Sequence, residues 1–175
     1  MHKQLRDYIN LSRKKFVKKT GKEEIHDFTK KAIIALNMWE LKPKKAELPI
    51  CDTDNNIGTA IDAICTNTRK EIVLVEWKCG FDGYFEKGNE YMAAPLGGVL
   101  NSPLNQAFCQ IIIEAEILRR FYNTDVKCLY VIQINKSGIY PHIVPDNFLA
   151  LSTIIYDTLI GSFVANKKAH KHWIK

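Results

Sequence analysis

The sequence predicts a single α/β domain in which helices cover a mixed β-sheet. Apolar residues recur with helical and strand periodicities in the order helix, strand, strand, helix, strand, strand, helix. A length of 175 residues suits one domain with a hydrophobic core. Hydrophobic residues make up 46% of the chain and charged residues 25%, which is an ordinary balance for a globular protein.

The first half of the chain predicts one helix and one pair of strands. Residues 22–41 form the helix, because apolar side chains recur there at steps of three and four. The following stretch "LKPKKAELPICDTDNN" (residues 41–56) is rich in proline and lysine, and we expect a connection. Two strands at about 57–66 and 71–79 are joined by the turn "NTRK".

The second half predicts a long loop, two helices and two more strands. Residues 80–102 contain several glycines and a small hairpin around "EKGN"; a loop of this length inside a compact domain is more often functional than idle. Residues 103–122 form a helix that is apolar on two sides, as expected for a helix between two layers. The strand "VKCLYVIQIN", its partner "GIYPHIV" and a helix over 145–165 follow.

Positive charge is concentrated at the two ends of the chain. Residues 1–22 carry a net charge of +7 and residues 167–175 a net charge of +4, whereas residues 23–166 carry −5. We therefore divide the chain into a basic segment (1–21), a central domain (22–166) and a basic tail (167–175). Basic ends favour a polyanion such as nucleic acid, with a merely solubilising role as the alternative. The N-terminal candidates are Arg13, Lys14, Lys15, Lys18 and Lys19.

The ends and the cysteines also predict the compartment. The start "MHKQLRDYINLSRKK" is polar and basic, which does not fit a signal peptide. No apolar run approaches the roughly 20 residues of a membrane span. The five cysteines lack zinc-binding spacing. We expect an intracellular protein of the cytoplasm or nucleus, with no membrane partner.

Three charged residues lie on the predicted pair of strands. Side chains alternate along a strand, so Glu76 and Lys78 point the same way and Trp77 points oppositely. A plain hairpin about the turn 67–70 sets Asp62 opposite residue 75 and next to Glu76. Two buried carboxylates repel each other unless a cation lies between them, and Mg²⁺ is a suitable ion. The alternatives are an ion pair on an edge strand and an acid beside a turn.

This pattern resembles the PD-(D/E)XK nucleases, whose fold is the restriction-endonuclease-like mixed sheet flanked by helices. Asp62, thirteen further residues and then Glu76-Trp77-Lys78 match the D…(D/E)xK signature, within "IGTAIDAI" and "IVLVEWKCG". The helix "SPLNQAFCQIIIEAEIL" resembles the glutamine-bearing helix of the RecB and lambda-exonuclease branch, which reads roughly Q-x-x-x-(Y/Q). The phrase "MAAPLGGVLNSPLNQAFCQ" is also similar to nuclease-like proteins of large DNA viruses. The resemblance covers residues 22–135.

The resemblance implies a Mg²⁺-dependent deoxyribonuclease, with Mn²⁺ as a substitute ion, that acts in recombination, repair or replication. Asp62, Glu76 and the Trp77 backbone carbonyl would hold the metal, and Lys78 would be the catalytic lysine. Members often add a glutamate from the first helix. The further candidates that the resemblance implies are Gln106 and Gln110, for the site or the DNA backbone, and Glu24 or Glu40, with Asp27 behind them, for the metal.

One residue departs from the family pattern, and several alternatives stay open. Ile61 stands where the signature has proline, a position at which many members differ. The alternatives are an RNA endonuclease of the same fold, a fold relative that binds DNA without cutting it, and a scaffold in which the acids form salt bridges. The sequence leaves open whether cleavage starts from an end, and whether a homo-oligomer or a recombination partner protein is involved.

Overall fold

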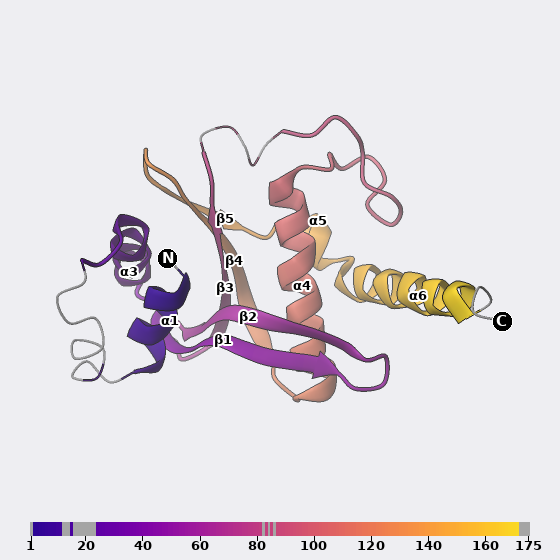
Figure 1. Cartoon of the computed structure of the whole chain (residues 1–175), viewed down its shortest axis with the longest axis horizontal. Helices are drawn as coiled ribbons and strands as arrows, with labels where there is room; N and C mark the ends of the chain where they lie inside the picture. Colours follow the sequence, from indigo (N-terminus) through magenta and orange to yellow (C-terminus); the bar gives the residue numbers. More distant parts are fainter. Residues whose placement is uncertain are drawn as a thin grey trace.

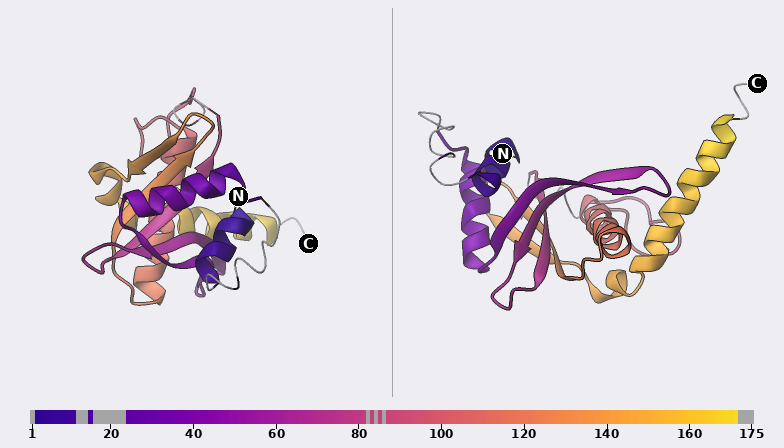
Figure 2. Two further views of the ribbon diagram at one scale, coloured as in Figure 1. Left: turned by 90° about the vertical axis from the view of Figure 1, so that its left-hand side faces the viewer. Right: turned by 90° about the horizontal axis from the view of Figure 1, so that it is seen from below.

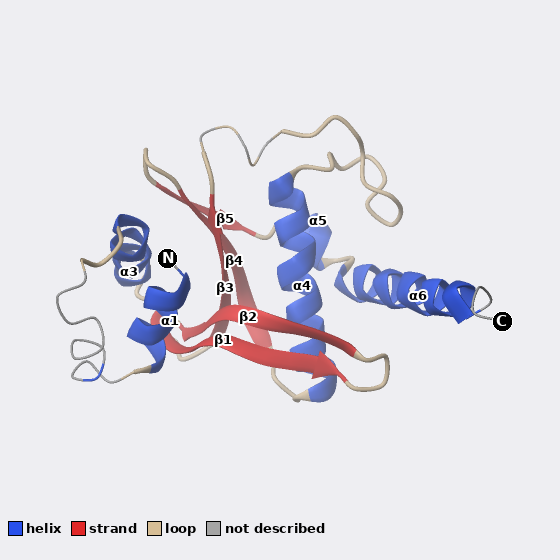
Figure 3. Cartoon of the chain, in the orientation of Figure 1, coloured by secondary structure: helices blue, strands red, loops and turns tan. Residues whose placement is uncertain are grey.

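Helices flank both faces of a five-stranded sheet in the computed structural model (Figures 1 and 3). The structure describes residues 2–11, 15, 24–81, 83, 85 and 87–171, with the side chains of 163–171 left out. The elements in chain order are α1 (His2–Asn10), α3 (Asp27–Met38), β1 (Lys42–Asp52), β2 (Ile57–Thr66), β3 (Ile72–Cys79), α4 (Pro103–Phe121), β4 (Val126–Ile134), β5 (Ile139–Ile143), α5 (Asp146–Leu149) and α6 (Ser152–Lys171). The predicted mixed sheet with helices on its faces is confirmed.

The strands pair in the order β1-β2-β3-β4-β5, and all pairs are antiparallel except β3 with β4. The turn between β2 and β3 lies where "NTRK" predicts it. There the Asn67 side-chain oxygen accepts hydrogen bonds from the backbone N–H groups of Arg69 and Glu71, both at 3.0 Å. The parallel pair requires the chain to cross over the sheet, and α4 is the helix of that crossover.

The edge strand β1 corrects the sequence analysis, which expects a connection over residues 41–56. Eleven residues of that stretch, Lys42–Asp52, form a strand that pairs with β2 from Lys42↔Thr66 to Asp52↔Ile57. Proline lacks a backbone donor and lysine is strongly solvated, so both residue types are tolerated on an edge strand. The composition that indicates a loop is therefore also that of a protected sheet edge.

The first helix of the fold lies inside the segment that the sequence analysis treats as a basic end. Leu5 of α1 is 2% exposed. The Asn10 side chain exchanges two hydrogen bonds with the Ala46 backbone on β1, at 2.8 and 2.9 Å. Residues 2–10 therefore belong to the folded unit. Of the basic candidates only Lys15 is described; the others, Arg13, Lys14, Lys18 and Lys19, lie outside the described residues.

The helix expected over 22–41 is shorter than predicted. It is α3, Asp27–Met38, and the ring nitrogen Nδ1 of His26 caps its start by accepting from the Phe28 backbone N–H at 3.1 Å. The helix expected over 145–165 is divided into α5 and α6, and α6 projects from the body of the protein (Figure 2). No helix within the described ranges combines the length and the apolar composition of a membrane span.

Two apolar cores lie on opposite faces of the sheet. Helices α1 and α3 cover one face, and α4 covers the other together with α5 and the start of α6 (Figure 1). Along β3 the side chains alternate between these cores, with Val73, Val75 and Trp77 facing α1 and α3, and Leu74 facing α4. Glu76 and Lys78 follow Leu74 on the α4 side.

The loop between β3 and α4 forms a small hairpin, but later than predicted. Instead of residues 86–89, Tyr91 and Leu100 form the bridge, and the Met92 N–H donates to the Val99 carbonyl at 2.8 Å. A Cβ atom at Gly88 would lie 2.7 Å from the Asn101 carbonyl oxygen, so only glycine fits this close approach. Ser102 then caps α4 by accepting from the Asn105 N–H at 3.3 Å. The loop is thus tied to the start of α4.

Candidate active site

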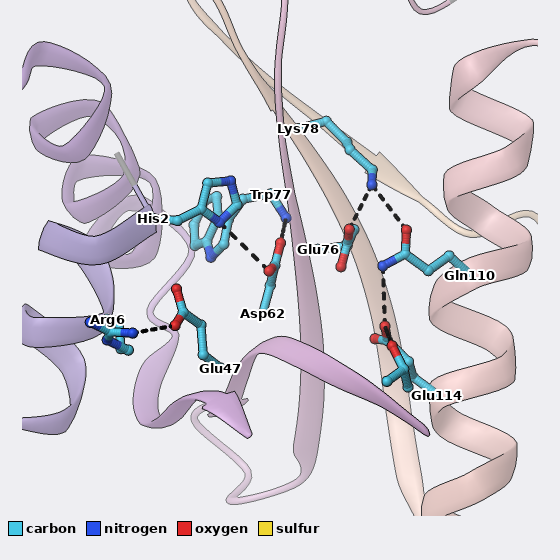
Figure 4. Close-up of polar contacts among 10 residues, drawn as sticks. His2, Arg6, Glu47, Asp62, Glu76, Trp77, Lys78, Gln110 and Glu114 are labelled. Atoms are coloured by element: carbon cyan, nitrogen blue, oxygen red, sulfur yellow. Dashed lines mark hydrogen bonds and ion pairs between the residues drawn. The ribbon is translucent and has the colours of Figure 1, made fainter. Parts of the chain in front are cut away.

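Asp62 lies where β2 and β3 stop exchanging regular backbone hydrogen bonds. The last pair is Ala63↔Val75, and the same register continued by one residue sets Asp62 opposite Glu76, one position from the expected residue 75. The Asp62 Oδ2 atom accepts a hydrogen bond from the Trp77 backbone N–H at 2.9 Å. This bond fixes one carboxylate oxygen beside the end of β3 (Figure 4).

Charged groups of both signs influence Asp62. Burial raises the pKa of Asp62, while the Trp77 N–H and the Lys78 ammonium oppose that rise and Glu47 adds to it. The imidazole Nδ1 of His2 lies 3.6 Å from Asp62 Oδ1, and Arg6 pairs with Glu47 at 2.8 Å. Helix α1 therefore borders the site on its outer side.

Glu76 and Lys78 form the centre of the site. The Lys78 Nζ atom lies 2.7 Å from Glu76 Oε1 and 3.0 Å from Gln110 Oε1 on α4. Glu76 is 3% exposed, and its Oε2 atom has no hydrogen-bond partner among the described residues. Burial raises the pKa of Glu76 to about 7, the charge of Asp62 adds to the rise, and Lys78 opposes it.

Glu114 is a site residue that the sequence analysis does not name. It lies one helical turn after Gln110, whose Nε2 donates to Glu114 Oε1 at 3.2 Å, and the Thr59 hydroxyl donates to the same oxygen at 3.3 Å. Glu114 is 1% exposed, and its Oε2 is buried without a partner among the described residues. Burial raises the pKa of Glu114 to about 8, and the charge of Glu76 adds to the rise.

A simple spacing rule identifies Glu114 in retrospect. Gln106, Gln110 and Glu114 are separated by four residues each, so they share one face of a helix. The surrounding run "IIIEAEIL" conceals this face, since its apolar residues dominate the periodicity. A polar stripe inside an apolar helix is therefore the signal to search for.

The other predicted site residues lie away from Glu76 and Lys78. Gln106 donates to Asn101 at 2.8 Å and is exposed. Glu24 and Asp27 both pair with Lys30, at 3.7 and 3.2 Å, on the segment that begins α3. Glu40 is exposed just after α3. The acid that a helix brings to the cluster is Glu114 of α4.

The chemistry of this cluster fits a hard divalent cation. Among the described residues the Glu76 Oε2 atom is buried without a partner, and an unpaired buried acceptor is costly unless a cation lies against it. Mg²⁺ needs only one or two carboxylates, because water and substrate oxygens complete its shell. Among the described residues no group of three or more His, Cys, Asp or Glu side chains could hold an ion. Asp62, Glu76 and the Trp77 carbonyl, the ligands that the resemblance implies, stay a prediction.

Two pockets lie along α4. The first, which we call the Gln110 pocket, has a volume of about 290 Å³ and is lined by Thr59, Met92, Gln106, Cys109, Gln110, Ile113 and Glu114. A larger pocket of about 390 Å³ includes Glu116 and Arg119 and shares no residue with the cluster. Of these two pockets, the Gln110 pocket is the one that adjoins Gln110 and Glu114 of the candidate active site.

No protein-family model and no curated protein matches the sequence. Among solved structures, the chain is similar to the crystal structure of a candidate exonuclease from Eubacterium rectale, with a TM-score of 0.52 and 12% sequence identity. The match covers 95% of this chain and 66% of the other, so the chain spans just under two thirds of that protein. At this identity the likeness shows the fold alone. The protein has a restriction-endonuclease-like α/β fold.

Proposed function

We propose that the protein is a metal-dependent nuclease that hydrolyses phosphodiester bonds of DNA. The observation that carries the proposal is the contact of Lys78 with Glu76 at 2.7 Å, with Asp62 opposite on the neighbouring strand. Glu76 is buried and Asp62 is partly buried, and the charge of Lys78 opposes the rise that burial causes in the pKa of both carboxyl groups, so the three groups influence one another near the end of β3. The fold shared with a candidate exonuclease supports the same class of reaction.

The two carboxylates would hold the metal. Burial raises the pKa of both Asp62 and Glu76, because it disfavours the charged carboxylate. A bound cation would stabilise that charged form. When bound, Mg²⁺ or Mn²⁺ would supply a Lewis acid for the phosphate oxygens. The hydrogen bond from the Trp77 N–H holds Asp62 in a fixed orientation for that task.

Lys78 would act on the phosphate group. An ammonium group has three N–H donors, and contacts with Glu76 and Gln110 use two of them. The third donor can bind a phosphate oxygen and stabilise the negative charge that develops during attack by water. Gln110 is itself held by Glu114, so α4 determines where the Lys78 nitrogen lies.

The family resemblance favours DNA and a role in recombination, repair or replication. Lys15, with Arg13, Lys14, Lys18 and Lys19, would contact phosphate groups and contribute affinity rather than base specificity. A homo-oligomer or a recombination partner protein is part of the same proposal. The basic C-terminal tail would act in the same way as the N-terminal residues.

A pair of variants tests this function. Lys78→Ala and Asp62→Asn are assayed with Mg²⁺, Mn²⁺ or EDTA on single-stranded, double-stranded and branched DNA, and on matched RNA. We expect the wild type to cut DNA only with a metal, and both variants to lose cleavage while they still fold and bind DNA.

The matched control is Lys127→Ala, which removes an ammonium group that pairs with Asp125 at the other end of the sheet. It should cut at the wild-type rate. Full activity in Lys78→Ala or Asp62→Asn would contradict the site assignment. Cleavage of RNA but not DNA would show that the substrate is RNA. If no strand is cut, the proposal of a nuclease is wrong.

A further inference from the structure

The Gln110 pocket adjoins the reacting groups but contains none of them. Gln110 and Glu114 line it, and Gln110 is also in contact with Lys78 at 3.0 Å. Any molecule in the pocket therefore lies one side chain away from the lysine that would bind the phosphate.

The walls of the pocket are of two kinds. Met92, Cys109 and Ile113 supply apolar surface, and Met92 comes from the long loop between β3 and α4. Gln106, Gln110 and Thr59 form a much smaller polar part of the wall, and each already donates a hydrogen bond within the protein. A small flat ligand with apolar faces and a few polar groups at its edge matches this mainly apolar wall.

Glu114 provides the second sign of a ligand. It is 1% exposed, lines the pocket, and has a buried Oε2 atom without a partner among the described residues. A buried carboxyl oxygen of this kind is stabilised when a ligand supplies a hydrogen-bond partner, which is a donor for the ionised form and an acceptor for the protonated form. The edge of a nucleobase carries both donors and acceptors.

The volume decides between a base and a larger group. About 290 Å³ lies just below the range for small-molecule pockets, which begins near 300 Å³, and so favours a group no larger than a single base. Enzymes that take up a single base hold it between apolar side chains and read its edge by hydrogen bonds.

We propose that the Gln110 pocket takes one unpaired nucleobase of the strand that is cut, next to the phosphate at Lys78. This inference rests on the proposed nuclease function and specifies its substrate: a strand with at least one base free of its partner. Double-stranded DNA would have to open locally, whereas a single strand or a frayed end would enter directly.

The test compares strands with and without bases. Binding is measured in EDTA, so that nothing is cut, by fluorescence anisotropy of a labelled oligothymidylate and of a fully abasic strand of equal length. We expect the wild type to bind the abasic strand about tenfold more weakly, since one buried base contributes a factor of this order.

Two variants assign that difference to the pocket. Ile113→Trp fills it from α4 and Met92→Trp fills it from the loop, so failure of one to fold leaves the other. In each we expect the oligothymidylate to bind as weakly as the abasic strand. The control Ile34→Trp adds the same bulk at an exposed position of α3, where 49% of the residue is accessible, and should keep the wild-type difference.

The outcomes separate this proposal from the nuclease itself. If the wild type binds both strands equally, or binds neither, the pocket takes no base and the inference is overturned. The same holds if the filled variants retain the difference. If binding depends on the bases and on the pocket but no strand is cut with Mg²⁺, the nuclease proposal fails and the base site remains.

Discussion

The two faces of β3 carry different kinds of side chain although they belong to the same eight residues. Towards α1 and α3 the strand presents Val73, Val75 and Trp77, all within an apolar core. Towards α4 it presents Leu74, then Glu76 and Lys78, whose partners are polar groups on α4. The face towards α1 and α3 is an apolar core without charged side chains from β3, whereas the face towards α4 carries two charged side chains.

This difference indicates what each face contributes. Apolar burial stabilises the fold by about 25 cal/mol per Å², and in the described part of the chain the α1 and α3 face provides it with no buried, unpaired carboxylate oxygen. A buried carboxylate oxygen without a partner costs free energy, and among the described residues the α4 face has two of them, on Glu76 and Glu114. Such costs are typical of functional sites, where perturbed pKa values are concentrated.

Glu76→Gln gives the largest expected effect and tests the polar face. The change keeps the shape of the side chain but removes a ligand charge, so Mg²⁺-dependent cleavage should fall on the order of 10³-fold. The free energy of unfolding without metal should not decrease, because burial already disfavours the charged form. Cleavage rates and urea melts in EDTA measure both. A variant that is less stable but cleaves normally would mean that Glu76 serves stability and not catalysis.

Leu36→Ala tests the apolar face. Leu36 of α3 is 2% exposed, and truncation of a buried leucine typically costs about 2–5 kcal/mol. Urea denaturation should show this loss, while the cleavage rate of the remaining folded protein stays within about twofold of wild type. The control Ile34→Ala removes an exposed side chain of the same helix and should change stability by less than about 0.5 kcal/mol. Equal losses in both variants would disprove the assigned packing.

Glu114→Gln tests the cost of buried charge through its pH dependence. The pKa of Glu114 is about 8 in the folded state and its ordinary value is 4.5, so the folded state keeps the proton to a higher pH than the unfolded chain does. Stability is therefore full below pH 4.5 and is lost as pH rises through 8. In EDTA at pH 9 the variant should be more stable than wild type by roughly 2 kcal/mol, since each pKa unit is worth about 1.4 kcal/mol and relaxation reduces the full shift. No difference is expected at pH 4. A gain that is independent of pH would contradict this explanation.

Arg6→Ala gives the smallest expected effect. Arg6 pairs with Glu47 at 2.8 Å where α1 meets β1, but both side chains are partly exposed, at 38% and 30%. Such pairs contribute about 0–1 kcal/mol and are screened by salt. Thermal melts at low and high salt should show a small loss that disappears at high salt. A loss above about 2 kcal/mol would mean that α1 depends on this pair rather than on Leu5.

The centre of the sheet is the part that sequence alone predicts well. The strands β2 and β3 consist mostly of β-branched and apolar residues around a polar turn, and local propensity agrees there with the final fold. The predicted register of β2 and β3 agrees with the structure to within one residue, because the turn at 67–70 determines which residues of a hairpin face each other. The proximity of Asp62 to Glu76 follows from that register.

The edges of the fold were harder to predict. Strand β1 contains Pro43, Pro49 and three lysines, and its pairing depends on a neighbour rather than on its own composition. Helix α1 contains few apolar residues, so only its contact with the sheet distinguishes it from a charged end. In both elements tertiary contacts outweigh the local signal.

The helix acid shows the same limit within the site. The resemblance implies an acid from the first helix, Glu24 or Glu40, yet Glu114 of α4 is the acid that contacts Gln110. Which helix lies against Glu76 is determined by the path of the chain between β3 and β4, and no local pattern specifies that path. The shared face of Gln106, Gln110 and Glu114 was the available clue.

The parallel pairing of β3 with β4 has a consequence for how the protein reaches its working state. The Asp62–Trp77 contact joins residues 15 apart in the chain, whereas the Lys78–Gln110 contact joins residues 32 apart across the crossover. Closing the longer loop costs more chain entropy, and folding slows as such distant contacts become more important. The contact between Asp62 and Trp77 within the β2–β3 hairpin can form early during folding. Lys78 contacts Gln110 only after α4 has packed across the sheet.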